Sequence, residues 1–296
     1  MSVLNVFATE APAKINLSLF VGPTLPDGRH EVVTVMDSLT LVDDVRLTVG
    51  PQGLETDAVE CAGVEGPNLA AAAIAEFRRT TGWDGPPVQV HITKRIPVAG
   101  GMAGGSADAA AVLRLLAVAA DIDDRRLLED IAAELGSDVP SQVRGGLLLA
   151  SGVGQRLRPL MRREMYAAVV LPVAAELSTA DVYAKADQLG ISRDALGLAR
   201  ALTRTQAAVS SETLLEKLHN DLEEPARALC PVIDEALDAA RRAGADHAMV
   251  SGSGPTVLGL FFGDWYRERA ATARAGLEDE GRSPAPLLAL PAEPIG

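Results

Sequence analysis

Residues 97–110, PVAGGMAGGSADAA, carry the pattern that decides the fold: four glycines and a serine lie between a short strand pattern, Val88–Thr93, and an apolar helix pattern that starts at Ser106. Glycines let the main chain approach an anion closely, and a helix N-terminus offers unpaired N–H groups with a favourable dipole. The loop is therefore predicted to cradle a di- or triphosphate such as that of ATP.

Two familiar phosphate-binding loops do not match this stretch, because no lysine follows the glycines as in a Walker A loop and the G-x-G-x-x-G spacing of dinucleotide folds is absent. The alternative is an ordinary strand-to-helix connection, with Ser106 as the helix N-cap and Asp108 as a favourable first-turn acid. Two glycine pairs are more than such a connection needs, which favours phosphate binding.

The elements around this loop predict two domains of the α+β class, residues 1–155 and 156–296, because strands and helices alternate without a regular βαβ cadence. In the first domain we expect strands at 3–21, 31–42, 88–93 and 144–152 and helices at 68–81, from 106, and at 124–135. In the second we expect strands at 166–174, 247–250, 255–262 and 287–291, helices at 179–189, 193–208, 211–218 and 231–243, and a further helix before the last strand. The basic stretch Arg156–Arg163 is predicted to be a solvated linker face.

Composition limits the partners of the chain. Its 296 residues carry 40 acidic against 27 basic side chains, so long-range charge does not attract nucleic acid or an anionic membrane surface, and 3% aromatic residues are few for base stacking. Cys61 and Cys230 show no metal or redox spacing, and neither a signal peptide nor a membrane span is indicated. We therefore expect a cytoplasmic protein that holds any phosphorylated ligand by local groups.

A second glycine-rich element, SGSGPT at 251–256, connects two strand candidates. A tight hairpin turn is the alternative explanation for it. Together with the first loop it suggests one anion site lined from two domains.

Phosphoryl transfer also needs a base for the nucleophile and a cation for the developing charge, and our candidates are Asp138 and Lys14. Lys14 interrupts the apolar strand pattern APAKINL, and Asp138 follows Gly136-Ser137. The alternatives are a snorkelling lysine at a strand edge and an aspartate that N-caps a short turn. No Ser-His-Asp order or zincin spacing supports hydrolase chemistry.

Four separated motifs occur in one order: PAKINL at 12–17, the glycine loop at 97–110, LGSDVP at 135–140 and SGSGPT at 251–256. This order resembles the GHMP kinase superfamily of small-molecule kinases, and the likeness runs from about residue 9 to 262. With the string DGxHE at 27–31, it is most similar to the branch that phosphorylates the 2-hydroxyl of a diphosphocytidyl-linked methylerythritol, in the non-mevalonate route to isoprenoid precursors.

The resemblance implies a fold with an N-terminal domain like ribosomal protein S5 domain 2, a ferredoxin-like C-terminal domain and an active site in the cleft between them. It implies ATP and Mg²⁺ as cofactors, a small-molecule substrate, and a monomer or homodimer. No acidic metal ligand is evident in the sequence, and Ser106 is the one nearby hydroxyl that we name as a direct or water-mediated Mg²⁺ contact.

By position in the motifs, the resemblance places Asp138 as the catalytic base and Lys14 as the charge-stabilising partner. The implied ATP-binding residues are Asn68, Lys94, Pro97, Gly100, Gly101, Met102, Ala103, Gly104, Gly105 and Ser106. The implied substrate-binding residues are Asn16, His30, Thr179 and Tyr183.

One residue departs from the family pattern. Arg29 stands where the family carries an aromatic residue that stacks on cytosine; its guanidinium can also stack on a base, with Tyr183 on the other face. The alternatives are another GHMP-type kinase for a different small alcohol or acid, such as homoserine or mevalonate, and a non-catalytic nucleotide-binding module of the same fold. The presence of both Lys14 and Asp138 argues against the last.

Overall fold

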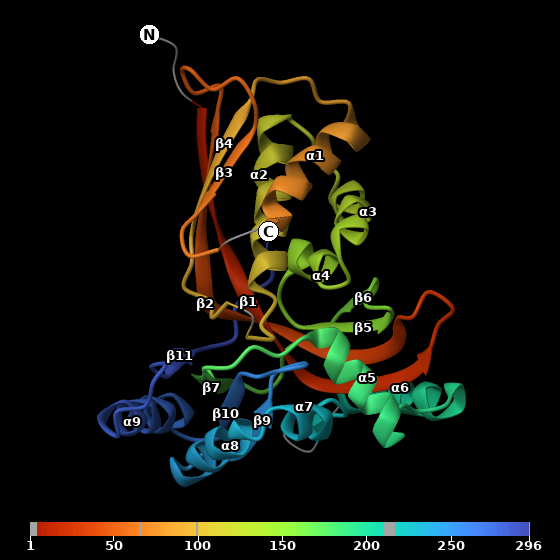
Figure 1. Ribbon diagram of the computed structural model, residues 1–296, viewed down its shortest axis with the longest axis vertical. Helices are drawn as coiled ribbons and strands as arrows, with labels where there is room; N and C mark the ends of the chain where they lie inside the picture. The colour runs from red at the N-terminus through yellow and green to blue at the C-terminus, as the bar shows by residue number, and fades with distance from the viewer. Residues whose placement is uncertain (1–4, 65–66, 99, 210–216, 296) are drawn as a thin grey trace.

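The computed structural model describes residues 5–64, 67–98, 100–209 and 217–295. It has an upper part built on a seven-stranded sheet and a lower part built on a four-stranded sheet (Figure 1). None of the described helices has the length and apolar character that crossing a bilayer demands. The mixed α and β content agrees with the predicted α+β class.

The upper sheet is organised by one long antiparallel hairpin, β1 (Asn5–Thr24) and β2 (His30–Val49). The strands that complete it are β3 (Ala58–Cys61), β4 (Val88–Thr93), β5 (Leu148–Gly152), β6 (Arg156–Pro159) and β8 (His219–Asn220). The order is β3-β4-β2-β1-β8, and β5 pairs with both β2 and β6. The short β3, β6 and β8 were not predicted, because runs of two to four residues show no usable periodicity.

Helices α1 (Leu69–Thr81), α2 (Gly104–Ala119), α3 (Arg125–Leu135) and α4 (Val139–Arg144) pack on one side of this sheet (Figure 1). The predicted start of the second helix was wrong by two residues. α2 begins at Gly104, after Ala103 in a left-handed conformation (φ 54°), and no side chain caps it. Ser106 is therefore inside the helix and is not its N-cap, and Asp108 is buried rather than a solvated first-turn acid.

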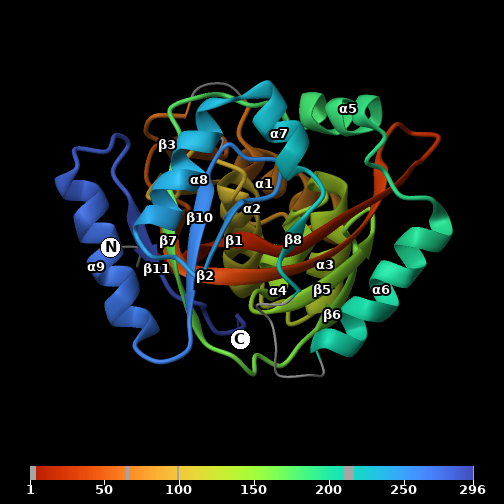
Figure 2. The same ribbon diagram turned by 90° about the horizontal axis from the view of Figure 1, so that it is seen from below.

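The lower sheet has the order β11-β7-β10-β9 and is antiparallel throughout. Its strands are β7 (Tyr166–Leu171), β9 (His247–Val250), β10 (Val257–Phe262) and β11 (Leu287–Ala289). The helices of this half are α5 (Thr179–Leu189), α6 (Ala195–Val209), α7 (Glu223–Leu229), α8 (Val232–Arg242) and α9 (Tyr266–Asp279). Figure 2 shows α8 and α9 over the face of this sheet that is turned away from the upper part. Most of the helix expected at 211–218 lies outside the described residues.

The two parts are joined by buried polar contacts. The prediction of a solvated Arg156–Arg163 face was wrong for Arg162, whose side chain is 9% exposed and donates from Nη2 to Asp37 Oδ1 at 2.7 Å. Tyr166 donates its hydroxyl to the same carboxylate, at 2.9 Å. A buried carboxylate needs such partners, which explains why this arginine turns inward. Because β6 pairs with β5, the larger sheet continues past residue 155, and the division at 155/156 stays a prediction.

Candidate active site

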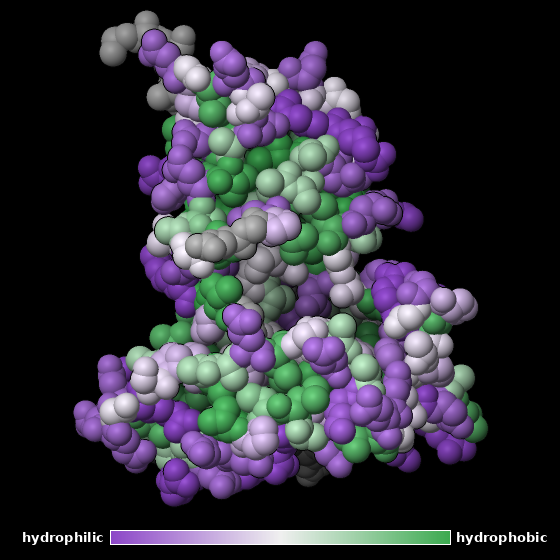
Figure 3. All heavy atoms as spheres, in the orientation of Figure 1, coloured by the Kyte–Doolittle hydropathy of each residue, from purple (hydrophilic) through white to green (hydrophobic). Residues whose placement is uncertain are grey.

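A pocket of about 990 Å³ is lined by residues from both parts of the molecule. On the face shown in Figure 3 the surface is hollowed where the upper and lower parts meet. The predicted site residues that line this pocket are Lys14, Asn16, His30, Asn68, Lys94, Pro97, Gly100, Gly101, Ala103, Gly104, Gly105, Ser106, Asp138, Thr179 and Tyr183. Residues from distant parts of the sequence thus meet in one cavity.

Met102 is the predicted site residue that does not line the pocket. Its side chain is 1% exposed and belongs to the hydrophobic core, while its carbonyl accepts a hydrogen bond from the backbone N–H of Lys14 at 3.1 Å. Its contribution is to tie the glycine loop to β1.

The glycine loop ends on the bare N-terminus of α2. The first helical hydrogen bond runs from Ala107 N to Ala103 O, so the amides of Gly104, Gly105 and Ser106 precede the intrahelical ladder. With no side-chain cap and with the helix dipole behind them, these N–H groups can bind an anion.

The SGSGPT element packs directly against this loop. A Cβ on Gly101 would lie 2.4 Å from the carbonyl oxygen of Ser251, and Gly101 has φ +71°, so no other residue fits. Ser251 Oγ donates to Gly101 O at 3.3 Å. The element connects the antiparallel strands β9 and β10, as expected for a hairpin turn. It also lines the pocket, with Gly252, Ser253 and Gly254.

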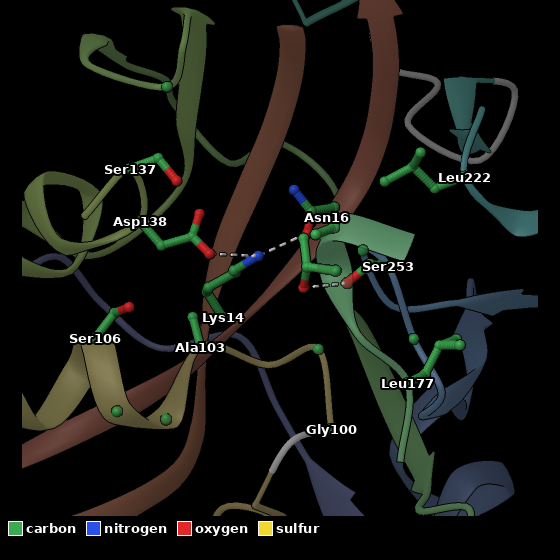
Figure 4. Close-up of a pocket in the computed structure, with 18 of the residues that line it drawn as sticks. Lys14, Asn16, Gly100, Ala103, Ser106, Ser137, Asp138, Leu177, Leu222 and Ser253 are labelled. Atoms are coloured by element: carbon green, nitrogen blue, oxygen red, sulfur yellow. Dashed lines mark hydrogen bonds and ion pairs between the residues drawn. The ribbon is translucent and has the colours of Figure 1, made fainter. Parts of the chain in front are cut away.

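Lys14 and Asp138 point toward each other across the pocket (Figure 4), with 3.4 Å between Nζ and Oδ2. The Lys14 side chain is 8% exposed, which excludes the snorkelling alternative, and that of Asp138 is 39% exposed. Asp138 stands at the N-cap of α4 but makes no capping hydrogen bond with its side chain. Its carboxylate therefore serves the pocket and not the helix.

A chain of hydrogen bonds fixes Lys14 from the side opposite Asp138. Lys14 Nζ donates to Asn16 Oδ1 at 2.8 Å, Asn16 Nδ2 donates to Thr34 Oγ1 at 2.8 Å, and Thr34 Oγ1 donates to Ser18 O at 2.7 Å. Because each donor meets an acceptor, the amide of Asn16 is held with its oxygen toward the ammonium. Thr34 was not found by sequence reasoning, since nothing distinguishes it from the other residues of a strand pattern.

The far end of the pocket is built around His30. Its Nε2 lies 2.9 Å from Asp187 Oδ1 and 3.0 Å from Thr24 Oγ1, and its ring lies 5.0 Å from that of Tyr183. Burial, together with the nearby charge of Asp138, raises the pKa of Tyr183, which keeps its hydroxyl protonated as a donor. Asp187 was missed because its helix position looks solvated; burial acts to raise its pKa, but hydrogen bonds from His30 and Ser192 outweigh this and lower it.

Three further residues singled out from the sequence also line the pocket. The exposed Arg29 also lines the pocket, and its guanidinium is paired with Asp27, at 2.6 Å from Nη2 to Oδ2. Asn68 caps α1 by accepting from Ala70 N at 2.8 Å. Thr179 Oγ1 lies 3.0 Å from Ser253 Oγ and so links α5 to the SGSGPT element.

The pocket offers few side chains that could bind a metal ion, so a metal ion there would be held mainly by the phosphates of a bound ligand. Among the described residues no group of three or more His, Cys, Asp or Glu side chains could hold a metal alone. Ser106 lies in the first turn of α2, and Figure 4 shows it on the same side of the view as Asp138. The Ser106 hydroxyl suits Mg²⁺ that arrives with a phosphate ligand, because this ion typically keeps few protein ligands and binds substrate phosphates.

Chemically, the pocket brings the glycine loop together with the buried ammonium of Lys14 and the partly exposed carboxylate of Asp138 (Figure 4). This set can hold a polyphosphate, accept a proton from a hydroxyl and stabilise negative charge on a phosphoryl group.

Family models match both halves of the chain. The model described as GHMP kinases N terminal domain matches residues 68–148, and the one described as GHMP kinases C terminal matches residues 195–283.

Curated relatives match over most of their length. A 4-diphosphocytidyl-2-C-methyl-D-erythritol kinase from Thermobifida fusca is 40% identical over 287 residues, which cover 89% of this chain and 90% of the relative. One of the same name from Corynebacterium efficiens is 42% identical over 263 residues, covering 82% of this chain and 81% of the relative.

Solved structures repeat the whole fold. A crystal structure of 4-(cytidine 5'-diphospho)-2C-methyl-D-erythritol kinase matches with a TM-score of 0.73 and 31% identity, covering 97% of this chain and all of that one. Homoserine kinase from Cytophaga hutchinsonii matches with a TM-score of 0.70 at 18% identity, covering 100% of this chain and 99% of that one, which shows a shared fold alone.

Proposed function

Since the chain belongs to the 4-diphosphocytidyl-2-C-methyl-D-erythritol kinases of the GHMP kinase family, we propose that the pocket between its two sheets is where phosphoryl transfer takes place. The activity is that of an ATP-dependent kinase of isoprenoid precursor synthesis. The acceptor that we assign is the 2-hydroxyl of the erythritol unit. The observation that carries the assignment is the Lys14–Asp138 pair facing the glycine loop within one cavity.

In this proposal Asp138 is the general base. A tertiary alcohol holds its proton tightly near neutral pH, so a carboxylate that accepts the proton as the oxygen attacks lowers the barrier. The side chain of Asp138 lines the pocket and makes no capping hydrogen bond to α4. The hydroxyl oxygen forms a bond to the γ-phosphorus of ATP as the bond from that phosphorus to the β,γ-bridging oxygen breaks and ADP leaves, and the hydroxyl proton moves to the Asp138 carboxylate.

Lys14 is the charge-stabilising partner. Its ammonium is held by Asn16 and Asp138, so it is already oriented before charge develops on the transferred group. Such a preorganised donor needs no reorientation during the reaction.

The amides of Gly104, Gly105 and Ser106 bind the phosphates of ATP in this scheme, with Asn68 and Lys94 at the nucleotide end. Asn16, His30, Thr179 and Tyr183 line the acceptor end. Mg²⁺, when bound with ATP, would neutralise phosphate charge, and Ser106 is the side chain that we name to contact it directly or through water.

We also propose a fold for each of the two domains. The order β11-β7-β10-β9, with α8 and α9 on one face, supports a ferredoxin-like C-terminal domain, and the hairpin β1–β2 with its helices supports an N-terminal domain like ribosomal protein S5 domain 2. We retain 1–155 and 156–296 as its domains, the cytoplasm as its location, and a monomer or homodimer as its state.

A turnover assay tests the assignment directly. The purified chain, ATP and Mg²⁺ are incubated with 4-diphosphocytidyl-2-C-methyl-D-erythritol, and ³¹P spectra are expected to show a new phosphomonoester on the erythritol unit. Folded protein that binds ATP without forming this product would contradict the assignment. The chain would then be a non-catalytic nucleotide-binding module of the same fold.

A different acceptor is the second candidate, and Arg29 is the observation that favours it, because it replaces the aromatic residue of the family pattern at the pocket rim. Homoserine and mevalonate belong in the same assay. Higher kcat/KM for either would move the assignment to that substrate.

A further inference from the structure

A buried cluster of three charged side chains lies beneath the glycine loop. Lys94 Nζ is 2.5 Å from Asp43 Oδ2 and 2.7 Å from Asp108 Oδ2. The side chain of Asp43 is fully buried, and those of Lys94 and Asp108 are 12% and 4% exposed. The second oxygen of Asp108, Oδ1, is buried and has no hydrogen-bond partner in the part of the chain that the structure describes.

The cluster connects the two ends of the loop. At the first end, Asp43 Oδ1 accepts hydrogen bonds from the backbone N–H groups of Arg95 and Ile96, at 2.5 and 2.9 Å. At the other end, Asp108 lies in the first turns of α2, which begins at Gly104. Lys94 bridges the two carboxylates and so spans the base of the loop.

The Lys94 ammonium packs closely under the N-terminus of α2. A Cβ on Gly104 would lie 3.1 Å from Lys94 Nζ, so the ammonium packs against the backbone of the first turn of α2. The Lys94 ammonium therefore lies between the start of the loop and the first-turn backbone of α2.

We propose that Asp43, Lys94 and Asp108 form a positioning clamp that fixes both ends of the phosphate-binding loop, so that Lys94 promotes ATP binding through the geometry of the loop. This rests on the proposed function, in which the loop holds the phosphates of ATP. The three residues are positioning residues, and Asp43 in particular does not line the pocket.

The net charge of the cluster favours a role for Lys94 in positioning the loop over direct attraction of the ATP phosphates. With both carboxylates ionised, the cluster carries one net negative charge, which repels a polyphosphate. Both ion pairs of Lys94 also compete with any contact between its ammonium and the ligand. The clamp therefore improves ATP binding by holding the amides in place, which is how preorganised sites gain affinity.

Asp43→Asn is the first test, because the amide keeps the shape and can still accept from Arg95 and Ile96 while it removes the charge that faces Lys94. Calorimetry with the β,γ-imido analogue of ATP is expected to show a Kd raised about tenfold. KM for the second substrate is expected to stay within about twofold, a split that general destabilisation would not produce.

Asp44→Asn is the matched control. Asp44 is the next residue of β2 and pairs with Arg95, beside Lys94, but this pair is exposed, with side chains 47% and 55% accessible. The analogue should bind this variant within about twofold of the wild type.

A double-mutant cycle separates the clamp from direct contact. If Lys94 acts through Asp43, the variant with both Asp43→Asn and Lys94→Met binds the analogue no more weakly than Lys94→Met alone. The clamp would be overturned if the increases in Kd of the two single variants multiply in the double variant, or if Asp43→Asn leaves the Kd unchanged. If Lys94→Met does not fold, Asp43→Asn and Asp108→Asn form the cycle with the same criteria.

Binding of the analogue to the wild-type protein distinguishes failure of the clamp proposal from failure of the proposed function. A wild-type chain that binds the analogue, with Asp43→Asn equal to it, contradicts the clamp alone. A folded wild type that does not bind the analogue contradicts ATP binding at the loop and removes the basis of the clamp.

Discussion

Lys14 is the residue on which the contacts of the pocket converge. Asn16 and Asp138 both contact its ammonium, Met102 accepts from its backbone N–H, and the Cβ position of Gly252 lies 3.8 Å from its Nζ. Each partner belongs to a different stretch of the chain. A buried ammonium with this many fixed neighbours is confined to one position, which is what stabilisation of a developing charge requires.

Thr34→Val tests whether the hydrogen-bond chain behind Lys14 matters. Valine keeps the shape but removes the acceptor of Asn16 Nδ2 and the donor to Ser18 O, so the amide of Asn16 is free to turn. We expect kcat to fall about five- to tenfold, with ATP affinity unchanged, and the free energy of unfolding to fall by about 1–3 kcal/mol. Steady-state kinetics and urea denaturation measure the two effects.

Thr34→Ser is the control for this substitution, because it restores the hydroxyl in a slightly smaller side chain. Its kcat should recover to near the wild-type value. Equal kcat values in Thr34→Val and the wild type would show that the orientation of Asn16 has no part in turnover.

At the scale of single elements, the two glycine-rich loops support each other. The left-handed Gly101 lies against the Ser251 carbonyl, so the shape of the first loop depends on a segment 150 residues away in the sequence. The loop amides are held between this segment on one side and α2 on the other.

Gly101→Ala is therefore expected to damage ATP binding. The added Cβ would lie 2.4 Å from a backbone oxygen and would require φ near +71°, so the loop must shift. The Kd of the ATP analogue should rise about tenfold or more, measured by calorimetry.

Gly276→Ala is the control in a helix. A Cβ there meets nothing within 4 Å, and alanine favours the helical state, so stability should rise by about 0.4–1 kcal/mol with ATP affinity unchanged. If Gly101→Ala binds the analogue as well as Gly276→Ala, the close approach of the two loops is not needed for binding.

Elements with strong local signals were the ones that the sequence could predict. The helix expected at 68–81 is α1, and the structure shows Asn68 as its N-cap and Gly82 as its C-cap. The start of α2 could not be read in the same way, because Ala103 adopts a left-handed conformation that alanine rarely shows. That conformation is imposed by tertiary packing of the loop, which leaves no local trace.

At the scale of the whole molecule, the joint between the two parts is made by contacts of very long sequence separation. Asp37 pairs with Arg162, 125 residues later, and the backbone N–H of Val21 donates to Asp221, 200 residues later. No pattern within a single segment indicates such pairs. The sequence motifs indicated most of the residues that line the pocket. The long-range contacts hold the two parts of the molecule in the arrangement that brings those residues together.

Arg162→Met tests the joint. It removes a guanidinium that bonds to both oxygens of the buried Asp37 and to the carbonyl of Ala292, and leaves that carboxylate with the Tyr166 hydroxyl. The free energy of unfolding should fall by about 3–5 kcal/mol in urea denaturation. Arg158→Met, on an exposed position of the same stretch, should change it by less than about 0.5 kcal/mol. Equal stability of the two variants would show that the buried pair does not hold the parts together.

The central claim is that Asp138 takes the proton of the acceptor hydroxyl while the glycine loop holds ATP. The most direct measurement is kcat of Asp138→Asn, with the Kd of the ATP analogue determined on the same preparation. We predict that kcat falls by about 10²- to 10⁴-fold while this Kd stays within about threefold. A kcat within about threefold of the wild type, in a variant that binds the analogue normally, would contradict it.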